Sequence, residues 1–152
     1  MTAFRQLQEL SHTFFSKFWT KPERVALLRI LYEAYNADGI FKIEEQREFY
    51  RHAFNLLATK EDMEEMDLDQ AIQIMKRSPA KMKIVYLWIA DAIVSDNEFN
   101  AEENAFVHSL EEKYGLDHKR LFKNIRELQT QRMEKLLNQW MYSVEKQMEN
   151  EV

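Results

Sequence analysis

An internal repeat constrains the fold of this chain more than any other feature of its sequence. Sliding the sequence by 58 positions aligns apolar residues, such as Leu31 with Ile89, and places acidic residues opposite acidic residues four times. The acidic pairs are Glu33 with Asp91, Asp38 with Asp96, Glu44 with Glu102 and Glu45 with Glu103. A fixed offset is typical of a duplicated unit that cannot bury its apolar face alone. We therefore expect two helix-loop-helix halves, about residues 23–58 and 81–116, packed about a pseudo-two-fold axis.

The composition favours helices over strands. The 152 residues include only two Gly and two Pro, so few residues suited to tight hairpin turns are present. Glu, Lys, Leu, Met and Gln, which are good helix formers, are frequent. The sequence therefore predicts an all-α fold, in which residues 1–152 form a single-domain helical bundle of about seven helices.

Apolar spacings of three and four residues place the individual helices. We expect helices at 3–18, from Thr20 to Gly39, at 43–59, after Asp67, at 79–95 and from Asn100 to Gly115, with a linker at 60–69. The chain restarts at Asp117, and its final segment has apolar residues at helical spacing from Leu121 on and ends in a C-terminal helix at 130–148. The helix at 79–95 is apolar on nearly all sides, so it should lie buried at the centre of the bundle.

The C-terminal helix carries an apolar stripe from Met133 to Met148 that needs a partner surface. The stripe could return across the bundle, or it could pair with its own copy in another chain. We expect it to pack within the chain, because a monomeric bundle must cover its apolar faces.

Composition also excludes several classes of protein. The chain has no Cys, which removes disulfides, thiolate metal sites and thiol nucleophiles and suits a reducing compartment. The N-terminus alternates polar with apolar residues, unlike a signal peptide, and the apolar stretch from Ile84 to Val94 is too short for a membrane span. A net charge of −5 disfavours nucleic-acid binding. We expect a cytoplasmic protein.

The two loops of the repeat are similar to calcium loops only in part. Asp38, Gly39 and Glu45 occupy positions at which an EF-hand has a ligand, the turn glycine and the bidentate glutamate. The leading ligand position, however, holds Ala34 in the first copy and Ala92 in the second, and alanine supplies no side-chain oxygen. An ordinary EF-hand is therefore excluded.

The same loops resemble the TerB-like (tellurite resistance protein B) family. The motif reads ADGIFKIEE at 37–45 and SDNEFNAEE at 95–103, and the resemblance covers about residues 23–127. It implies a compact bacterial helical bundle, an acidic surface proposed to hold a divalent cation, and a role in stress response or as a sensory and scaffolding module. Asn97 replaces the glycine of the second loop, and Lys42 stands where the first copy would have a capping residue, which weakens metal binding there.

A cation held by these loops would be calcium or magnesium, bound by carboxylates. The candidate metal ligands are Asp38, Glu45, Asp96 and Glu103, with Glu33 and Asp91 as outer support. A second interpretation needs no ion, because carboxylates in the first turn of a helix are stabilised by the helix dipole.

Catalytic motifs are lacking. A di-iron bundle needs two Glu-x-x-His pairs, and only Glu9 with His12 has that spacing. The sequence contains no Gly-rich phosphate loop and no nucleophile motif. We expect a non-enzymatic interaction or scaffold module with an unidentified protein partner, either monomer or homodimer. The alternative is a metal-dependent hydrolase that uses the clustered carboxylates.

Overall fold

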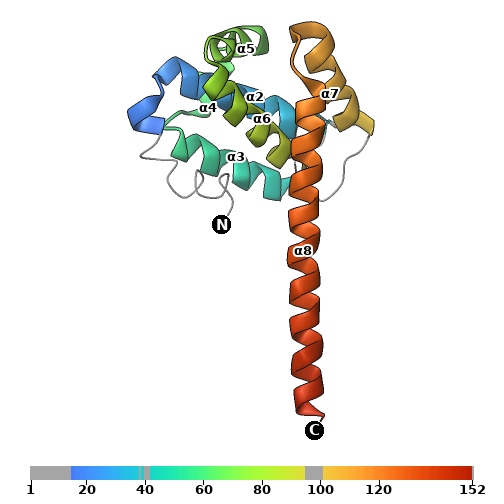
Figure 1. Cartoon of the computed structure of the whole chain (residues 1–152). Helices are drawn as coiled ribbons and strands as arrows, with labels where there is room; N and C mark the ends of the chain where they lie inside the picture. Colours follow the sequence, from blue (N-terminus) through green and yellow to red (C-terminus); the bar gives the residue numbers. More distant parts are fainter. Residues whose placement is uncertain (1–14, 38, 40–41, 95–100, 152) are drawn as a thin grey trace.

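The computed structural model describes residues 15–37, 39, 42–94 and 101–151 (Figure 1). Within these ranges every regular element is a helix, which confirms the all-α fold. Residues 15–18 are helical, while most of the helix expected at 3–18 lies outside the described residues. The helices that follow are α2 (Lys21–Tyr35), α3 (Ile43–Asn55), α4 (Lys60–Glu64), α5 (Leu68–Lys76), α6 (Pro79–Val94), α7 (Ala101–Tyr114) and α8 (His118–Asn150).

The repeat found in the sequence is present in the helix boundaries. Helices α2 and α6 begin at Lys21 and Pro79, and α3 and α7 begin at Ile43 and Ala101, so both pairs are offset by 58 residues. Helix α2 also packs against α6. Glu23 and Lys81, which are equivalent by the repeat, form an ion pair of 2.5 Å. Equivalent residues contact each other in this way where a two-fold axis passes between them.

Side-chain caps set the starts of several helices. Thr20 and Glu23 form a reciprocal capping box at α2, and Asp67 forms one with Gln70 at α5. A third box was not expected from the sequence: Thr59 and Asp62 exchange hydrogen bonds of 3.1 Å at the start of α4. The prediction of a linker at 60–69 is therefore wrong in its first half, which this box and the fully buried Met63 hold as a helix.

Helix α3 ends earlier than expected, at Asn55 rather than at residue 59. Leu57 adopts a φ of 53°, a left-handed backbone conformation that ends a helix. The expected end of α7 is confirmed. Gly115 has a φ of 70°, and the amide of Leu116 donates to the carbonyl of Leu110, as in a glycine C-cap.

Helix α6 is the centre of the bundle, as its sequence predicts. It packs against α2, α5 and α8, and nine of its 16 residues are buried. Figure 1 shows the other helices arranged around it. Trp88 of α6 is almost fully buried and meets the ring of Phe15 edge-on at 5.6 Å. Helix α6 is thus covered by α2 from the first half of the repeat, by α5 from the connection between the halves and by the C-terminal helix α8.

Helix α8 belongs only partly to the bundle. Its first half packs against α6 and α7 through buried Leu121 and Ile125. Its second half leaves the bundle and extends alone, as Figure 1 shows. We call residues 15–132 the head and residues 133–151 the tail. No residue of the tail is buried.

The expectation that the tail stripe folds back across the bundle is wrong. Residues 118–150 form one uninterrupted helix of 33 residues, and they contain neither Gly nor Pro. A return would need a turn between Leu128 and Met133, and these residues offer no turn chemistry. The helix therefore continues straight past the head, and the stripe lies on the part that extends beyond it.

Because the tail adds no buried contact to the head, its removal should leave head stability unchanged. At a protein concentration low enough for both chains to be monomers, a chain ending at Arg132 should unfold in urea with a free energy within about 0.5 kcal/mol of the full chain, when followed by the fluorescence of buried Trp19 and Trp88. Ile125→Ala in the full chain is the control, since loss of a buried side chain in the first half of α8 should cost about 2–5 kcal/mol. A comparable loss on truncation would contradict this division into head and tail.

Candidate functional site

The predicted acidic residues are not gathered in one place by the part of the chain that the structure describes. Glu45 of α3 and Asp91 of α6 approach the same side chain, Tyr35, whose pKa responds to both. Glu33 instead lies on α2 beside Arg29 and accepts a 2.7 Å hydrogen bond from its guanidinium. Glu103 is buried at the third position of α7, as Glu45 is at the third position of α3. Asp38 and Asp96 lie outside the described residues.

A cluster of polar and charged side chains surrounds buried Tyr35. Its hydroxyl lies 3.2 Å from Nε2 of His52, whose ring centroid is 4.5 Å from that of Trp88. Burial raises the pKa of Tyr35 well above its usual range, and the negative charges of Asp91, Glu48 and Glu45 add to this. Tyr35 is therefore neutral and keeps its proton. We use the name polar cluster for Tyr35, Glu45, Glu48, Arg51, His52, Asp91 and Arg132.

The titrating members of this cluster are shifted in opposite ways. Burial raises the pKa of Asp91 to about 6, although the positive charge of Arg132 lowers it. Burial, together with the charge of Arg51, lowers the pKa of His52 to about 4. His52 is thus a neutral imidazole at pH 7, held by stacking and one hydroxyl contact. These are the properties of a buried structural group rather than of an exposed acid or base.

Arg132 joins the cluster to α8 at the point where the tail begins. Its guanidinium donates a hydrogen bond to the carbonyl of Val94, the last residue of α6. A carbonyl in the last turn of a helix has no amide donor within that helix. Arg132 therefore satisfies this carbonyl of buried Val94 and places positive charge at the negative end of the helix dipole. Arg132 therefore fixes α8 to the end of α6.

The sequence contained signals for some of these residues. Glu45, Phe49 and His52 are spaced by four and three along α3, so they share the buried face of that helix. Glu48 follows Glu45 by three and lies beside it. The contact between Tyr35 and His52 and the role of Arg132 join different helices and have no local signal.

The described residues offer no metal centre. Among them, no three or more His, Asp or Glu side chains lie in a group that could hold a metal ion. Because Asp38 and Asp96 are outside those residues, the predicted cation site stays a prediction.

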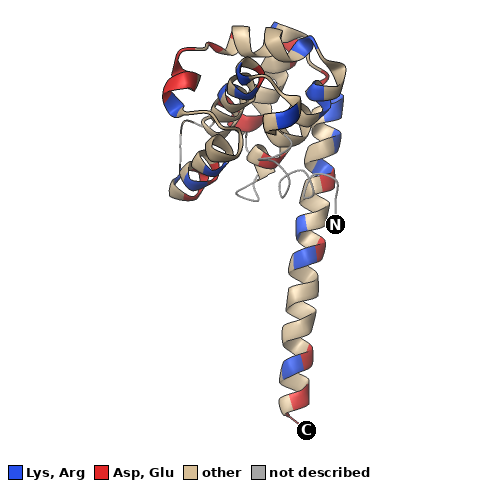
Figure 2. Ribbon diagram, turned by 90° about the vertical axis from the view of Figure 1, so that its left-hand side faces the viewer, with Lys and Arg blue, Asp and Glu red and all other residues tan. Residues whose placement is uncertain are grey.

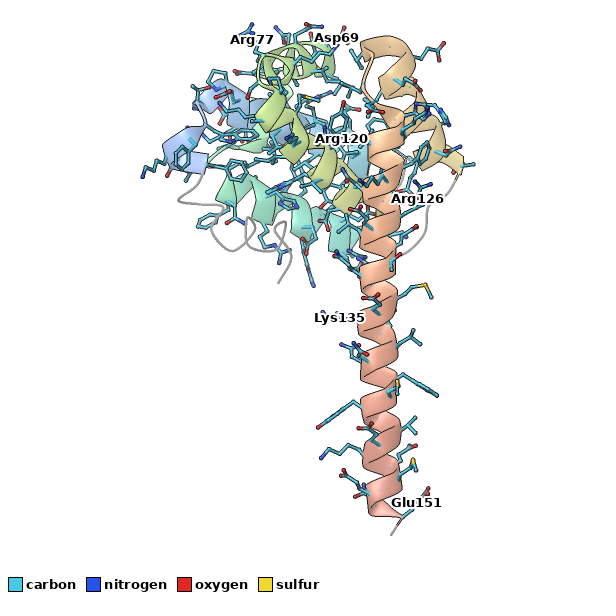
Figure 3. All side chains as sticks on the ribbon, in the orientation of Figure 1. Asp69, Arg77, Arg120, Arg126, Lys135 and Glu151 are labelled. Carbon is cyan, nitrogen blue, oxygen red and sulfur yellow. The ribbon has the colours of Figure 1, made fainter. Side chains whose placement is uncertain are left out.

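Two shallow surface depressions lie away from the polar cluster. One is lined by residues of α5 and the loop after it, including Asp69 and Arg77, and the other by Lys123, Arg126 and their neighbours on α8. Figure 3 places Asp69 and Arg77 at the end of the head that is opposite the tail. Both depressions are open and lined mainly by charged and amide side chains. Neither brings the carboxylates of the polar cluster into contact with a bound molecule.

The most unusual surface is on the tail. Large apolar side chains there are more than half exposed, with Trp140 at 65% and Met133 at 63%. We define the apolar stripe as Met133, Leu136, Leu137, Trp140, Met141, Val144 and Met148. The middle of the tail is tan in Figure 2, because residues 136–144 include no Lys, Arg, Asp or Glu. No helix in the described part of the chain is both long enough and apolar enough to cross a membrane.

Comparisons of the chain with protein-family models, with curated proteins and with solved structures found no significant match. The resemblance to TerB-like proteins therefore rests on the loop motifs alone.

The opposite pKa shifts predict how stability depends on pH. The folded protein protonates Asp91 near pH 6, whereas the unfolded chain does so near its ordinary value of 3.8, so Asp91 stabilises the fold as the pH falls from 6 to 4. His52 acts in the opposite direction. Its pKa is lowered from the ordinary 6.5 to about 4 in the folded protein. The stability that neutral His52 contributes is therefore lost as the pH falls from 6.5 to 4.

In Asp91→Asn the stability that protonation of Asp91 adds at low pH is removed, while the stability that protonation of His52 takes away at low pH is still lost. Between pH 7 and pH 4 we expect this variant to lose about 2 kcal/mol more unfolding free energy than the wild type, measured by urea unfolding at each pH. His52→Gln should show the opposite change, because its unfolding free energy at pH 4 should be higher, relative to its value at pH 7, than that of the wild type. Parallel stability curves for the three proteins would show that neither group is buried as described.

Proposed function

We propose that this chain is a non-enzymatic protein-interaction module whose tail binds a helix of another protein molecule. The observation that carries the proposal is the exposure of the apolar stripe on a helix segment, residues 133–151, in which no residue is buried. Seven apolar residues on one face, most of them more than half exposed, amount to roughly 700 Å² of surface, and monomeric proteins rarely leave more than a few hundred Å² of apolar surface in one patch.

The length and pattern of the stripe fit a helical partner. Its residues recur at intervals of three and four over Met133–Met148, which is the spacing that one helix presents to another. The head then serves as a stable base that holds the tail through α6 and α7. Binding through the tail leaves the surface of the head accessible for a further contact.

The alternative of a metal-dependent hydrolase is not favoured by any observation on the described residues. Glu45 and Asp91, which both approach Tyr35, adjoin this buried side chain and the aromatic core. A hydrolase needs its carboxylates to face a substrate. We propose, from the TerB-like motifs, that the module acts in the cytoplasm of a bacterium in stress response, modulated by a divalent cation.

Calorimetry tests the cation. Titration of the full chain with calcium, magnesium, zinc and manganese should give binding heat for one of these ions, and Asp96→Ala with Glu103→Ala should abolish it. The matched control is Glu44→Ala with Glu102→Ala, which removes the same charge from exposed neighbouring positions and should keep the heat. The absence of heat with every ion would remove the cation from the proposal and leave the interaction module.

Photocrosslinking in cells of the source organism tests the interaction itself. A benzoylphenylalanine in place of Trp140 should give a discrete adduct on illumination, because this position lies within the apolar stripe. The same analogue in place of Tyr142, an equally exposed aromatic residue on the other side of the helix, should give none. Mass spectrometry identifies the captured protein, and Leu137→Glu should abolish the adduct. Illumination that yields no adduct at either position would refute the proposed function.

A further inference from the structure

We propose that the protein bound by the apolar stripe is a second copy of this chain, and that the two tails associate as a parallel pair of helices. This inference rests on the proposed function and names its partner. It is carried by the distribution of charge beside the stripe, by the area of the stripe and by the position of the head on α8.

The charges on the two edges of the stripe differ. At 3.6 residues per turn, Glu134 and Glu145 border the stripe on one side, whereas Gln139 and Ser143 border it on the other. In a parallel pair related by a two-fold axis, each edge faces the opposite edge of the partner helix. The carboxylates of one copy then meet amide and hydroxyl donors of the other copy.

An antiparallel pair places like charges together. Each edge of the stripe then faces the same edge of the second copy. If the pair is centred on Trp140, Glu134 of each copy lies beside Glu145 of the other, which gives two such contacts in the dimer. Like charges at the edge of an apolar seam oppose association. The sequence of the tail therefore selects the parallel arrangement.

The spacing of the stripe suits a pair of helices. Met133 and Trp140, Leu137 and Val144, and Met141 and Met148 are each seven residues apart. A seven-residue apolar spacing keeps the stripe on the side of a helix that faces a partner helix in a coiled coil. Helix α8 runs straight through the tail in Figure 1.

The area of the stripe is adequate for a dimer. Its side chains expose roughly 700 Å² on each chain, close to the roughly 800 Å² that each partner contributes to a standard stable interface. A second copy carries an identical stripe of the same length, so the two surfaces match end to end in a parallel register.

The heads do not obstruct this arrangement. Leu121 and Ile125, which bind α8 to the head, point about 120° away from the centre of the stripe when both are placed on one helical projection. In a parallel pair the two heads therefore lie at the same end, on outer sides of the two helices.

A membrane surface is a less suitable partner. Residues 133–151 contain four Glu and two Lys, so the polar face of the tail is acidic. Helices that lie on membranes carry Lys and Arg on that face to bind anionic lipids. Flotation with vesicles of phosphatidylcholine and phosphatidylglycerol should leave the full chain unbound, and co-flotation that Trp140→Glu abolishes would overturn the assignment of the stripe to a second copy.

Sedimentation equilibrium of the full chain tests the association. The mass should be twice 18.4 kDa at tens of micromolar. Trp140→Glu should weaken the dimer by roughly tenfold or more, because an aromatic side chain at the centre of an interface carries much of its binding energy. Tyr142→Glu, which adds the same charge two residues away on the opposite side of α8, should leave the dimer intact. Circular dichroism checks that both variants stay helical.

Disulfide trapping tests the orientation, because the chain has no Cys of its own. Met133→Cys should form a disulfide-linked dimer on mild oxidation, and Lys135→Cys, on the opposite side of the helix, should not. An antiparallel pair separates the two introduced thiols at position 133 by about 21 Å at 1.5 Å per residue, and instead links Met133→Cys to Met148→Cys in a mixture. That mixed product would overturn the parallel arrangement.

The failures of the two proposals can be told apart. A full chain that sediments as a monomer at about 100 micromolar overturns the second copy as partner. If the photocrosslink at position 140 then joins a different protein, the interaction module stands and only its partner changes. A monomer with no photocrosslink overturns both.

Discussion

The burial of α6 is the interaction on which the rest of the structure depends. This helix is apolar on nearly all sides, so it is stable only when other helices surround it. Helices α2, α5 and α8 provide that cover, and each large side chain that α6 buries contributes about 1.5–3 kcal/mol. The need to cover α6 therefore recruits elements from the first half of the repeat, from the connection between the halves and from the C-terminal helix.

The direction of α8 is fixed by the head, because the first half of α8 must pack along α6 to cover one of its apolar sides. Leu121 and Ile125 align its first half along α6, and Arg132 holds it at the carbonyl of Val94. From that point a helix without Gly or Pro continues in the same direction. The exposure of the apolar stripe thus follows from packing in the head combined with the absence of a turn.

Much of this fold could be predicted from local sequence. The caps at Thr20 and Asp67, the buried helix at the centre and the 58-residue repeat all depend on residues close together or on periodic patterns. Helix α4 was missed because its residues are mainly charged, and its stability comes from a capping box and a single buried methionine. Charge composition alone cannot distinguish such a helix from a linker.

The site was less predictable for a physical reason. A carboxylate at the third position of a helix has the same sequence pattern whether it binds an ion, caps a helix or packs in the interior. Glu45 and Glu103 are both buried, and only the neighbours that the fold brings to each carboxylate, such as Tyr35 near Glu45, determine its environment. An apolar stripe is likewise the same pattern whether its partner surface belongs to the same chain or to another.

The polar cluster explains why the head tolerates the charge of Asp91 near the point where the tail leaves the head. Asp91 lies in the most apolar helix, where burial opposes its ionisation, yet Arg132 and Arg51 bring positive charge to it. Arg132 is also the last head residue of α8 and the donor to Val94. The same guanidinium therefore offsets the charge of Asp91 and anchors the base of the tail. A substitution at Arg132 would change both the ionisation of the cluster and the angle at which the stripe leaves the head, whereas a substitution within the stripe would change neither.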